Sequence, residues 1–213
     1  MAMSIRTFRR RLTEIDMFFE GTDRVHQTMR RVAACLDHAG ISYAIVGGMA
    51  VNAHHHERTT KDVDFLLTSG GFAAFRKVAD AGDFEPVPGR ARRFVDRATK
   101  VTFDVLVTGH FPGSGNPGPI TFPDPADVGH PLGNLRVVDL PTLIQLKLAA
   151  RRYQDFADVV NLIRANNLDE SFQGKLHPSV QGDFIECLEE KRREDEYEAR
   201  QDRAVQEDEG QKP

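Results

Sequence analysis

Two aspartates spaced two residues apart are the first side chains of this chain whose types and spacing could do chemistry. Asp62 and Asp64 enter an apolar run, so on a strand both carboxylates would point to one face. Carboxylates held side by side repel each other unless a cation lies between them, and Mg²⁺ favours such oxygen ligands together with substrate phosphates. The alternative is a solvated strand end with Arg58 or Lys61 as counterion.

A third carboxylate, Asp104, lies in a later run that is otherwise apolar. Phe103 and Val105 share one face of the expected strand, which leaves Asp104 on the other face. A carboxylate in a central strand needs a partner, because burying it alone is costly or forces its protonation. A metal ion shared with the first pair would supply that partner, and a salt bridge to Arg92 or Arg93 is the alternative.

A pair of glycines, Gly47 and Gly48, lies between an apolar segment and a short helical one. The N-terminus of a helix offers unpaired N–H groups and a partial positive charge, and glycine lets a phosphate approach the main chain closely. The pair could therefore hold phosphates. A tight strand-to-helix turn without a ligand is the alternative, since glycine is common in turns.

The other metal-ligating residue types are not spaced for a metal ion. Consecutive helix positions point in different directions, so residues 54–56, three histidines in a row, cannot all face one ion. Cys35 and Cys187 are isolated, which indicates neither a disulfide framework nor a zinc site. We expect a cytoplasmic protein, because no apolar run is long enough to span a membrane and residues 6–20 lack the apolar core of a secretion signal.

The period of the apolar residues predicts the elements that must position these side chains. Strands with interspersed helices predict an α/β or α+β sheet, and a segment rich in glycine and proline, residues 109–127, predicts an irregular loop. Strands are expected over residues 41–46, 63–67, 92–96, 101–107 and 135–138, and helices over residues 23–38, 49–56 and 72–81.

The pattern changes after Pro141, where two consecutive helices follow without a further strand. From about Val180 the chain favours helix and becomes dense in charge, and beyond Arg193 we expect a solvated helix that frays. Three regions are expected: residues 1–140 as a core with N-terminal helices, residues 141–190 as a helical subdomain and residues 191–213 as a charged tail.

The net charge gives no strong indication of a partner. The 213 residues carry a formal charge of −4, and residues 186–213 hold eleven acidic against six basic side chains. The rest of the chain is therefore close to neutral. A nucleic-acid-binding protein usually has a strongly basic face, so the bulk charge does not indicate one, although it leaves room for a local basic groove.

The order of these motifs resembles the nucleotidyltransferase superfamily of the polymerase-beta type. Within it, the run Gly47–Val51, the pattern Arg58-x-Thr-x-Asp-x-Asp64 and the segment Lys147–Arg151 are similar to the abortive-infection, AbiEii-like branch. The resemblance implies an α+β fold, with a small mixed β-sheet flanked by helices and a C-terminal helical subdomain. Related sequences often have a basic residue where this chain has Gln154, which puts a catalytic role for the following aspartates in doubt.

The resemblance also implies roles for the candidate residues. Gly47 and Gly48 would hold the triphosphate, Asp62 and Asp64 would bind two metal ions, Mg²⁺ or Mn²⁺, and Asp104 would complete the metal site and help deprotonate the acceptor hydroxyl. A nucleoside monophosphate would thereby pass from a nucleoside triphosphate to that hydroxyl.

Basic side chains are expected to contact the phosphates. Lys147 and Arg151 are four residues apart on an expected helix and would form one basic patch, with Lys147 as the contact that the resemblance implies. A surface ion pair between Arg151 and Asp155 is the alternative. Arg58 would be either a phosphate ligand or the counterion of Asp62.

The acceptor stays open at this level. The branch includes toxins that act on nucleotides or on RNA ends such as tRNA, so we expect an RNA hydroxyl as acceptor and an antitoxin protein as a partner. A small-molecule enzyme of the antibiotic-modifying kind is one alternative. A non-catalytic module that binds a nucleotide or a partner is another, although the presence of all three carboxylates argues against it.

Overall fold

A seven-stranded mixed sheet forms the centre of the computed structural model, which describes residues 13–80 and 82–210. The strands lie in the order β3-β4-β5-β2-β1-β7-β6. β2 pairs parallel with β5 and antiparallel with β1. The strands are β1 (Tyr43–Val46), β2 (Asp62–Leu67), β3 (Phe84–Pro86), β4 (Arg93–Asp96), β5 (Thr102–Val107), β6 (Gly129–Leu132) and β7 (Leu135–Val138).

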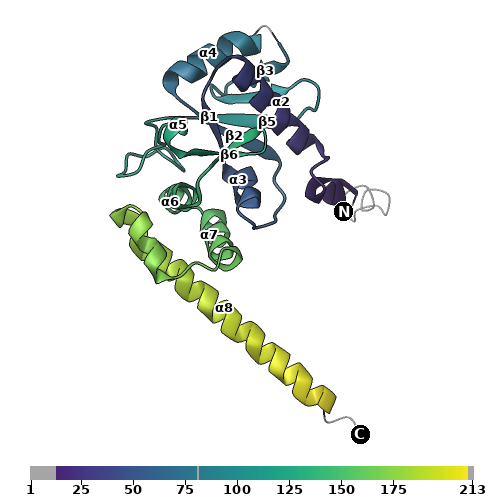
Figure 1. Cartoon of the computed structure of the whole chain (residues 1–213), viewed down its shortest axis with the longest axis vertical. Helices are drawn as coiled ribbons and strands as arrows, with labels where there is room; N and C mark the ends of the chain where they lie inside the picture. Colours follow the sequence, from purple (N-terminus) through teal and green to yellow (C-terminus); the bar gives the residue numbers. More distant parts are fainter. Residues whose placement is uncertain (1–12, 81, 211–213) are drawn as a thin grey trace.

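Helices cover both sides of the sheet, with α2 and α4 on one side and α3, α6 and α7 on the other (Figure 1). The expected α+β fold, with a mixed sheet flanked by helices and a helical C-terminal region, is confirmed. The helices are α2 (Arg24–His38), α3 (Gly47–Ala53), α4 (Ser69–Asp80), α5 (Pro125–Val128), α6 (Leu140–Ala150), α7 (Tyr153–Ala165), η1 (Glu170–Lys175, 3₁₀) and α8 (Pro178–Gly210).

Aromatic packing fixes which face of the sheet is closed. Phe75 of α4 contacts the rings of Phe84, Phe94 and Phe103. Along β5, buried and half-buried residues alternate, so the odd-numbered side chains fill this core and the even-numbered ones point to the opposite face. Asp104 is even-numbered, so its side chain points away from this aromatic core, as the sequence predicts. It points to the side of the sheet that carries α3 and α6.

The expected strands and helices are present, and the structure adds four short elements. These are β3, α5, β6 and η1, none of which has a periodic apolar pattern. β3 contains Pro86 and lies at the edge of the sheet, where proline costs no ladder hydrogen bond. β6 is Gly-His-Pro-Leu and is a strand because it pairs with β7.

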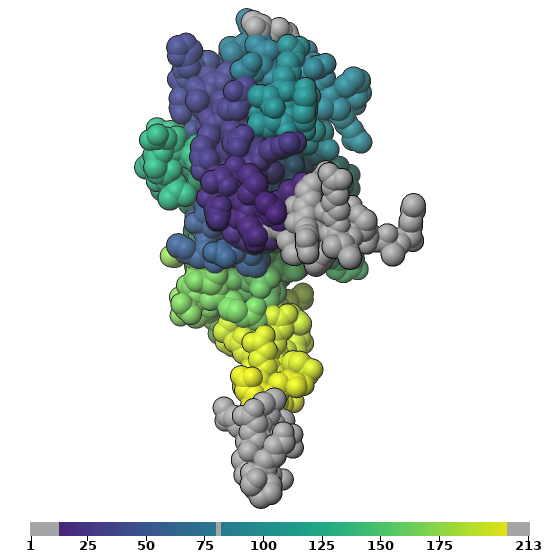
Figure 2. Space-filling model, turned by 90° about the vertical axis from the view of Figure 1, so that its right-hand side faces the viewer, coloured from purple at the N-terminus to yellow at the C-terminus, as the bar shows by residue number. Residues whose placement is uncertain are grey.

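The long helix α8 projects from the rest of the molecule (Figures 1 and 2). Its first half packs on α7 and α6, and beyond Lys191 most of its described side chains are exposed. It continues as helix to Gly210, past the residue where we expect fraying. No helix in the described part of the chain is both long and apolar enough to cross a bilayer. Residues 6–12 of the segment tested for a secretion signal, and the start of the expected N-terminal helices, lie outside the described residues.

Candidate functional site

The sheet register brings the three predicted carboxylates together. Asp64 on β2 is the direct partner of Asp104 on β5, and Asp104 is in turn the partner of Arg93 on β4. Directly opposed side chains lie on the same face of a sheet, and Asp62, two residues before Asp64, shares that face. All four side chains line one cavity of about 680 Å³ between the sheet and α6.

The Gly47-Gly48 turn forms one wall of this cavity, where β1 ends and α3 begins. Gly47 has a φ of +62°, and a Cβ there would lie 1.9 Å from Oδ2 of Asp64. No other residue type fits, because both the backbone conformation and the space exclude a side chain. A Cβ at Gly48 would lie 2.9 Å from the side chain of Thr60. The glycines thus let the main chain of the turn approach the side chains of Asp64 and Thr60.

Arg93 is the partner of two of the three carboxylates. Its Nε and Nη2 atoms donate to the two carboxylate oxygens of Asp104 at 2.9 and 2.6 Å, and Nη2 also donates to Asp62 at 3.3 Å. The structure therefore contains the salt bridge that is the alternative partner for Asp104. Arg92 points elsewhere and lies 3.0 Å from Nδ1 of His110.

Asp64 is the carboxylate without a cation beside it. No side chain in the described part of the protein donates a hydrogen bond to it. Burial, and then the negative charges of Asp62 and Asp104, raise the pKa of Asp64 from its ordinary value of 3.8 to about 7. The charges of Lys147 and Arg152 offset only part of this increase in the pKa, and Arg93 donates its hydrogen bonds to the other two carboxylates.

This donor set suits a hard divalent cation, although its groups do not yet converge on one point. Within residues 13–80 and 82–210, no three His, Cys, Asp or Glu side chains are close enough together to hold an ion. Asp62 and Asp64 offer adjacent oxygens on one face, and the raised pKa of Asp64 indicates that a positive charge would be favourable there. Arg93 engages Asp104 through two contacts, which leaves Asp62 and Asp64 as the better candidates for binding a cation.

The raised pKa predicts how the metal-free protein responds to pH. Asp64 binds a proton more tightly in the folded than in the unfolded chain, so its contribution to stability is present below about pH 4 and is lost as pH rises toward about 7. Asp64→Asn replaces the carboxylate with a neutral amide, so the variant does not lose this contribution to stability as the pH rises. We expect the variant, in the presence of a chelator, to be more stable than wild type at pH 8 by about 1–3 kcal/mol, since one pKa unit corresponds to about 1.4 kcal/mol.

Urea unfolding at pH 5 and pH 8 measures the difference. The gap between variant and wild type should be much smaller at pH 5 than at pH 8. An equal gap at both pH values would mean that Asp64 does not titrate in this range.

Lys147 lies beneath the cavity in a buried network of charges. Its side chain is 7% exposed, and Nζ lies 3.3 Å from Asp155 and 2.6 Å from Asp158, both of which are buried. Asp158 also pairs with Arg58, at 2.8 Å from Nε and 3.1 Å from Nη2. Gln154 donates to the same carboxylate at 3.1 Å. The two aspartates of α7 thus hold the cations in place, which fits the absence of a basic residue at position 154.

The structure corrects three expectations about the basic residues. Arg151 does not continue α6: it is the C-cap with a left-handed backbone, and its side chain pairs with Asp183 of α8 at 2.6 Å. It is not among the residues that line the cavity, so it forms no shared patch with Lys147. Its alternative pairing with Asp155 is also wrong, because Arg152 takes that place at 2.6 Å. Arg58 is the partner of Asp158 and not of Asp62.

Some residues of the site could not be predicted from the sequence. Arg152 and Arg90 line the cavity, as does the loop from Phe111 to Gly115. A Cβ at Gly113 would lie 2.5 Å from the carbonyl oxygen of Ala150, so the loop packs directly on the end of α6. The composition of this segment predicts an irregular loop, which it is, but nothing in the composition places it beside the carboxylates.

The three consecutive histidines lie at the end of α3. The Nε2 atom of His54 lies 2.7 Å from the carbonyl oxygen of Val138, which ties α3 to the end of β7. Burial lowers the pKa of His56. The three histidines follow the end of α3, and none of them lines the cavity.

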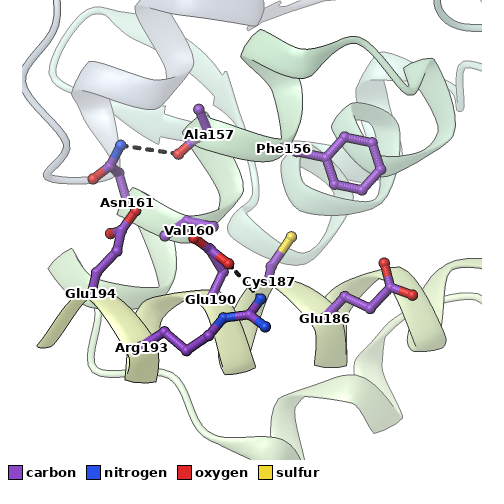
Figure 3. A pocket seen from close by; sticks show the side chains of 9 residues that line it. All are labelled: Phe156, Ala157, Val160, Asn161, Glu186, Cys187, Glu190, Arg193 and Glu194. Atoms are coloured by element: carbon purple, nitrogen blue, oxygen red, sulfur yellow. Dashed lines mark hydrogen bonds and ion pairs between the residues drawn. The ribbon is translucent and has the colours of Figure 1, made fainter. Parts of the chain in front are cut away.

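A second hollow, of about 350 Å³, lies between α7 and α8 (Figure 3). Phe156 and Cys187 form its apolar part, and Glu190 pairs with Arg193 at its edge. Burial raises the pKa of the Cys187 thiol to about 12, so this thiol is not a nucleophile at neutral pH. The hollow contains none of the carboxylates described above, and we place the candidate site in the cavity between the sheet and α6.

Comparisons with known proteins give similarity in overall structure only. No protein-family model matches the sequence. No curated protein matches it either. Among solved structures, ANT(2″)-Ia in complex with adenylyl-2″-tobramycin is 9% identical with a TM-score of 0.49, over 75% of this chain and 96% of that one. JHP933 from Helicobacter pylori is 12% identical with a TM-score of 0.43, over 71% and 70%. The assignments below rest on the geometry of this chain.

Proposed function

We propose that this protein is a Mg²⁺-dependent nucleotidyltransferase that transfers a nucleoside monophosphate from a nucleoside triphosphate to a hydroxyl group of RNA. The observation that carries the proposal is the row of carboxylates Asp62, Asp64 and Asp104 beside the Gly47-Gly48 turn in the lining of one cavity. Glycine at position 47 is imposed by the approach of the backbone to Asp64, which ties the turn to the carboxylates.

The residues of the cavity have distinct roles in this reaction. Asp62 and Asp64 would hold Mg²⁺, or Mn²⁺, which when bound neutralises phosphate charge and lowers the pKa of the attacking hydroxyl. Asp104 accepts the hydroxyl proton. The acceptor oxygen forms a bond to the α-phosphorus, and the bond from that phosphorus to the pyrophosphate oxygen breaks. The Gly47-Gly48 turn would hold the triphosphate through its main chain, as the sequence resemblance implies.

Arg152 is the phosphate contact that the geometry favours. Its side chain is 71% exposed and lines the cavity, so unused N–H groups can reach a ligand while one edge pairs with Asp155. Lys147 supplies positive charge from below, with its ammonium group bound to Asp155 and Asp158. Arg58, which shares the carboxylate of Asp158 with Lys147, contributes in the same way. Arg151 has no part in this proposal, because it faces α8.

The charge around the cavity supports RNA over a cationic antibiotic as acceptor. Six basic and four acidic side chains line it. Beside Asp104, the turn between β3 and β4 presents Arg90 and Arg92, both exposed, and neither pairs with a carboxylate among the described residues. A positively charged rim of this kind attracts a phosphate backbone and repels a polyamine. A toxin role with an antitoxin partner, in the cytoplasm, stays a prediction that follows from the sequence resemblance.

The proposal is tested by incubating the protein with each labelled nucleoside triphosphate, Mg²⁺ and total RNA. Label on RNA that disappears when Mg²⁺ is chelated supports the proposal. Label on an aminoglycoside in a parallel reaction, with none on RNA, would show that the acceptor is an aminoglycoside and not RNA. Binding of the triphosphate without transfer to any acceptor would instead favour a non-catalytic nucleotide-binding module.

Arg90→Gln should weaken the use of RNA without weakening triphosphate binding. A lost phosphate contact lowers RNA affinity for all sequences and reduces the slope of log affinity against log salt by about 1. The measurement is the KM for RNA at several salt concentrations. Arg97→Gln, on the same hairpin but outside the cavity, is the matched control. An unchanged salt slope in Arg90→Gln would show that this rim does not contact the acceptor.

A further inference from the structure

Arg93 is held among the carboxylates by the architecture of the sheet. β4 pairs with β5 so that Arg93 lies directly opposite Asp104, and its side chain is only 38% exposed. The guanidinium binds both oxygens of Asp104 and reaches one oxygen of Asp62. A paired, two-point contact of this kind is among the stronger hydrogen-bonded ion pairs in proteins. Arg93 is therefore a fixed part of the site.

We propose that Arg93 is a built-in counter-cation of the carboxylate cluster, which competes with the divalent metal ion for Asp62. This inference rests on the proposed function. In the metal-free protein the guanidinium relieves the repulsion between Asp62 and Asp104. When a metal ion binds, Arg93 gives up the single 3.3 Å contact to Asp62 and keeps the two shorter contacts to Asp104.

The geometry favours this division of roles. A guanidinium and a divalent cation on the same carboxylates repel each other, so the weaker of the arginine contacts is the one that yields. The contact to Asp62 is the longest of the three. Asp104 then stays oriented by Arg93 in both states, which makes Arg93 a positioning residue for the group that accepts the hydroxyl proton. It also explains why the carboxylates do not converge while Arg93 contacts both.

A second role for Arg93 predicts the opposite result. If Arg93 only orients Asp104 so that it can bind the metal ion, removing the guanidinium should weaken metal binding. If Arg93 competes with the metal ion, its removal should strengthen metal binding, because one positive charge no longer opposes the incoming cation. The direction of the change in metal affinity therefore separates the two roles, independently of catalysis.

The test is Mn²⁺ binding to the full chain without nucleotide, followed by the loss of the free Mn²⁺ signal in electron paramagnetic resonance. We expect Arg93→Gln to bind Mn²⁺ about tenfold more tightly than wild type. In a chelator, the variant should melt at a lower temperature than wild type, and saturating Mn²⁺ should raise its melting temperature by more. Arg97→Gln removes the same charge from the same hairpin and should match wild type in both measurements.

Each other outcome has a defined meaning. Equal or weaker Mn²⁺ binding by Arg93→Gln overturns the inference. If that variant does not fold, Arg93→Met replaces it, since methionine also removes the charge and keeps much of the length of the side chain, and tighter binding than wild type is still required. If Asp62→Asn abolishes Mn²⁺ binding in the wild-type background while Arg93→Gln changes nothing, the inference fails and the proposed metal site stands. If neither wild type nor Arg93→Gln binds Mn²⁺, the metal part of the proposed function fails as well.

Discussion

Asp62→Asn and Asp64→Asn should each lower Mg²⁺-dependent transfer by about a thousandfold or more. Both variants keep the shape of the side chain and remove the negative charge that holds the metal ion. A bound metal ion stabilises the transition state by several kcal/mol, and a loss of about 4 kcal/mol corresponds to roughly a thousandfold in rate. The measurement is the initial rate of label transfer to RNA at saturating Mg²⁺.

The fold should survive both substitutions, because neither carboxylate packs in the core on the Phe103 side of the sheet. Asp64→Asn should even stabilise the metal-free protein at high pH, since it removes a buried negative charge that lies beside two others. Asp127→Asn makes the same chemical change at an exposed position of α5, outside the cavity, and should leave the rate unchanged. Full activity in either site variant, with normal circular dichroism, would contradict the assignment of Asp62 and Asp64 as metal ligands.

The carboxylates were predictable because strand geometry fixes the face on which each one lies. A spacing of two residues places Asp62 and Asp64 on one side, and the apolar neighbours of Asp104 leave it no other side. The sequence does not say which strands are neighbours. The pairing of Asp64 with Asp104, and of Asp104 with Arg93, depends on a parallel and an antiparallel register that join segments far apart in the chain.

The basic residues were predicted less well because their roles depend on the next helix. From the sequence, Lys147 and Arg151 share a helix face. In the structure, α6 ends one residue before Arg151, which takes a left-handed backbone without a glycine to signal it. Whether Lys147 faces solvent or the interior is decided by Asp155 and Asp158, which α7 brings beneath it. Whether such a side chain is exposed or forms an ion pair depends on tertiary contacts, which the periodicity of the sequence does not predict.

Asp158→Ala should destabilise the protein by about 3–5 kcal/mol. The carboxylate is fully buried and is the shared partner of Lys147 and Arg58. Removing one partner of a buried ion pair leaves uncompensated charges in the interior, which is the costly case for such networks. Urea unfolding at pH 7 measures the loss, and the melting temperature should fall by on the order of 10 °C.

Breaking an exposed ion pair shows how much of the loss of stability comes from burial and how much from charge alone. Glu170→Ala breaks a pair with Arg192 in which both side chains are more than half exposed, and it should cost less than about 1 kcal/mol. Asp158→Asn keeps a hydrogen-bond acceptor for the two cations and should fall between the two alanine variants. A loss below about 1 kcal/mol in Asp158→Ala would mean that Lys147 and Arg58 reach solvent once their partner is gone. Because these cations form the floor and one wall of the cavity, the same variant should also weaken triphosphate binding, which links the buried network to the site above it.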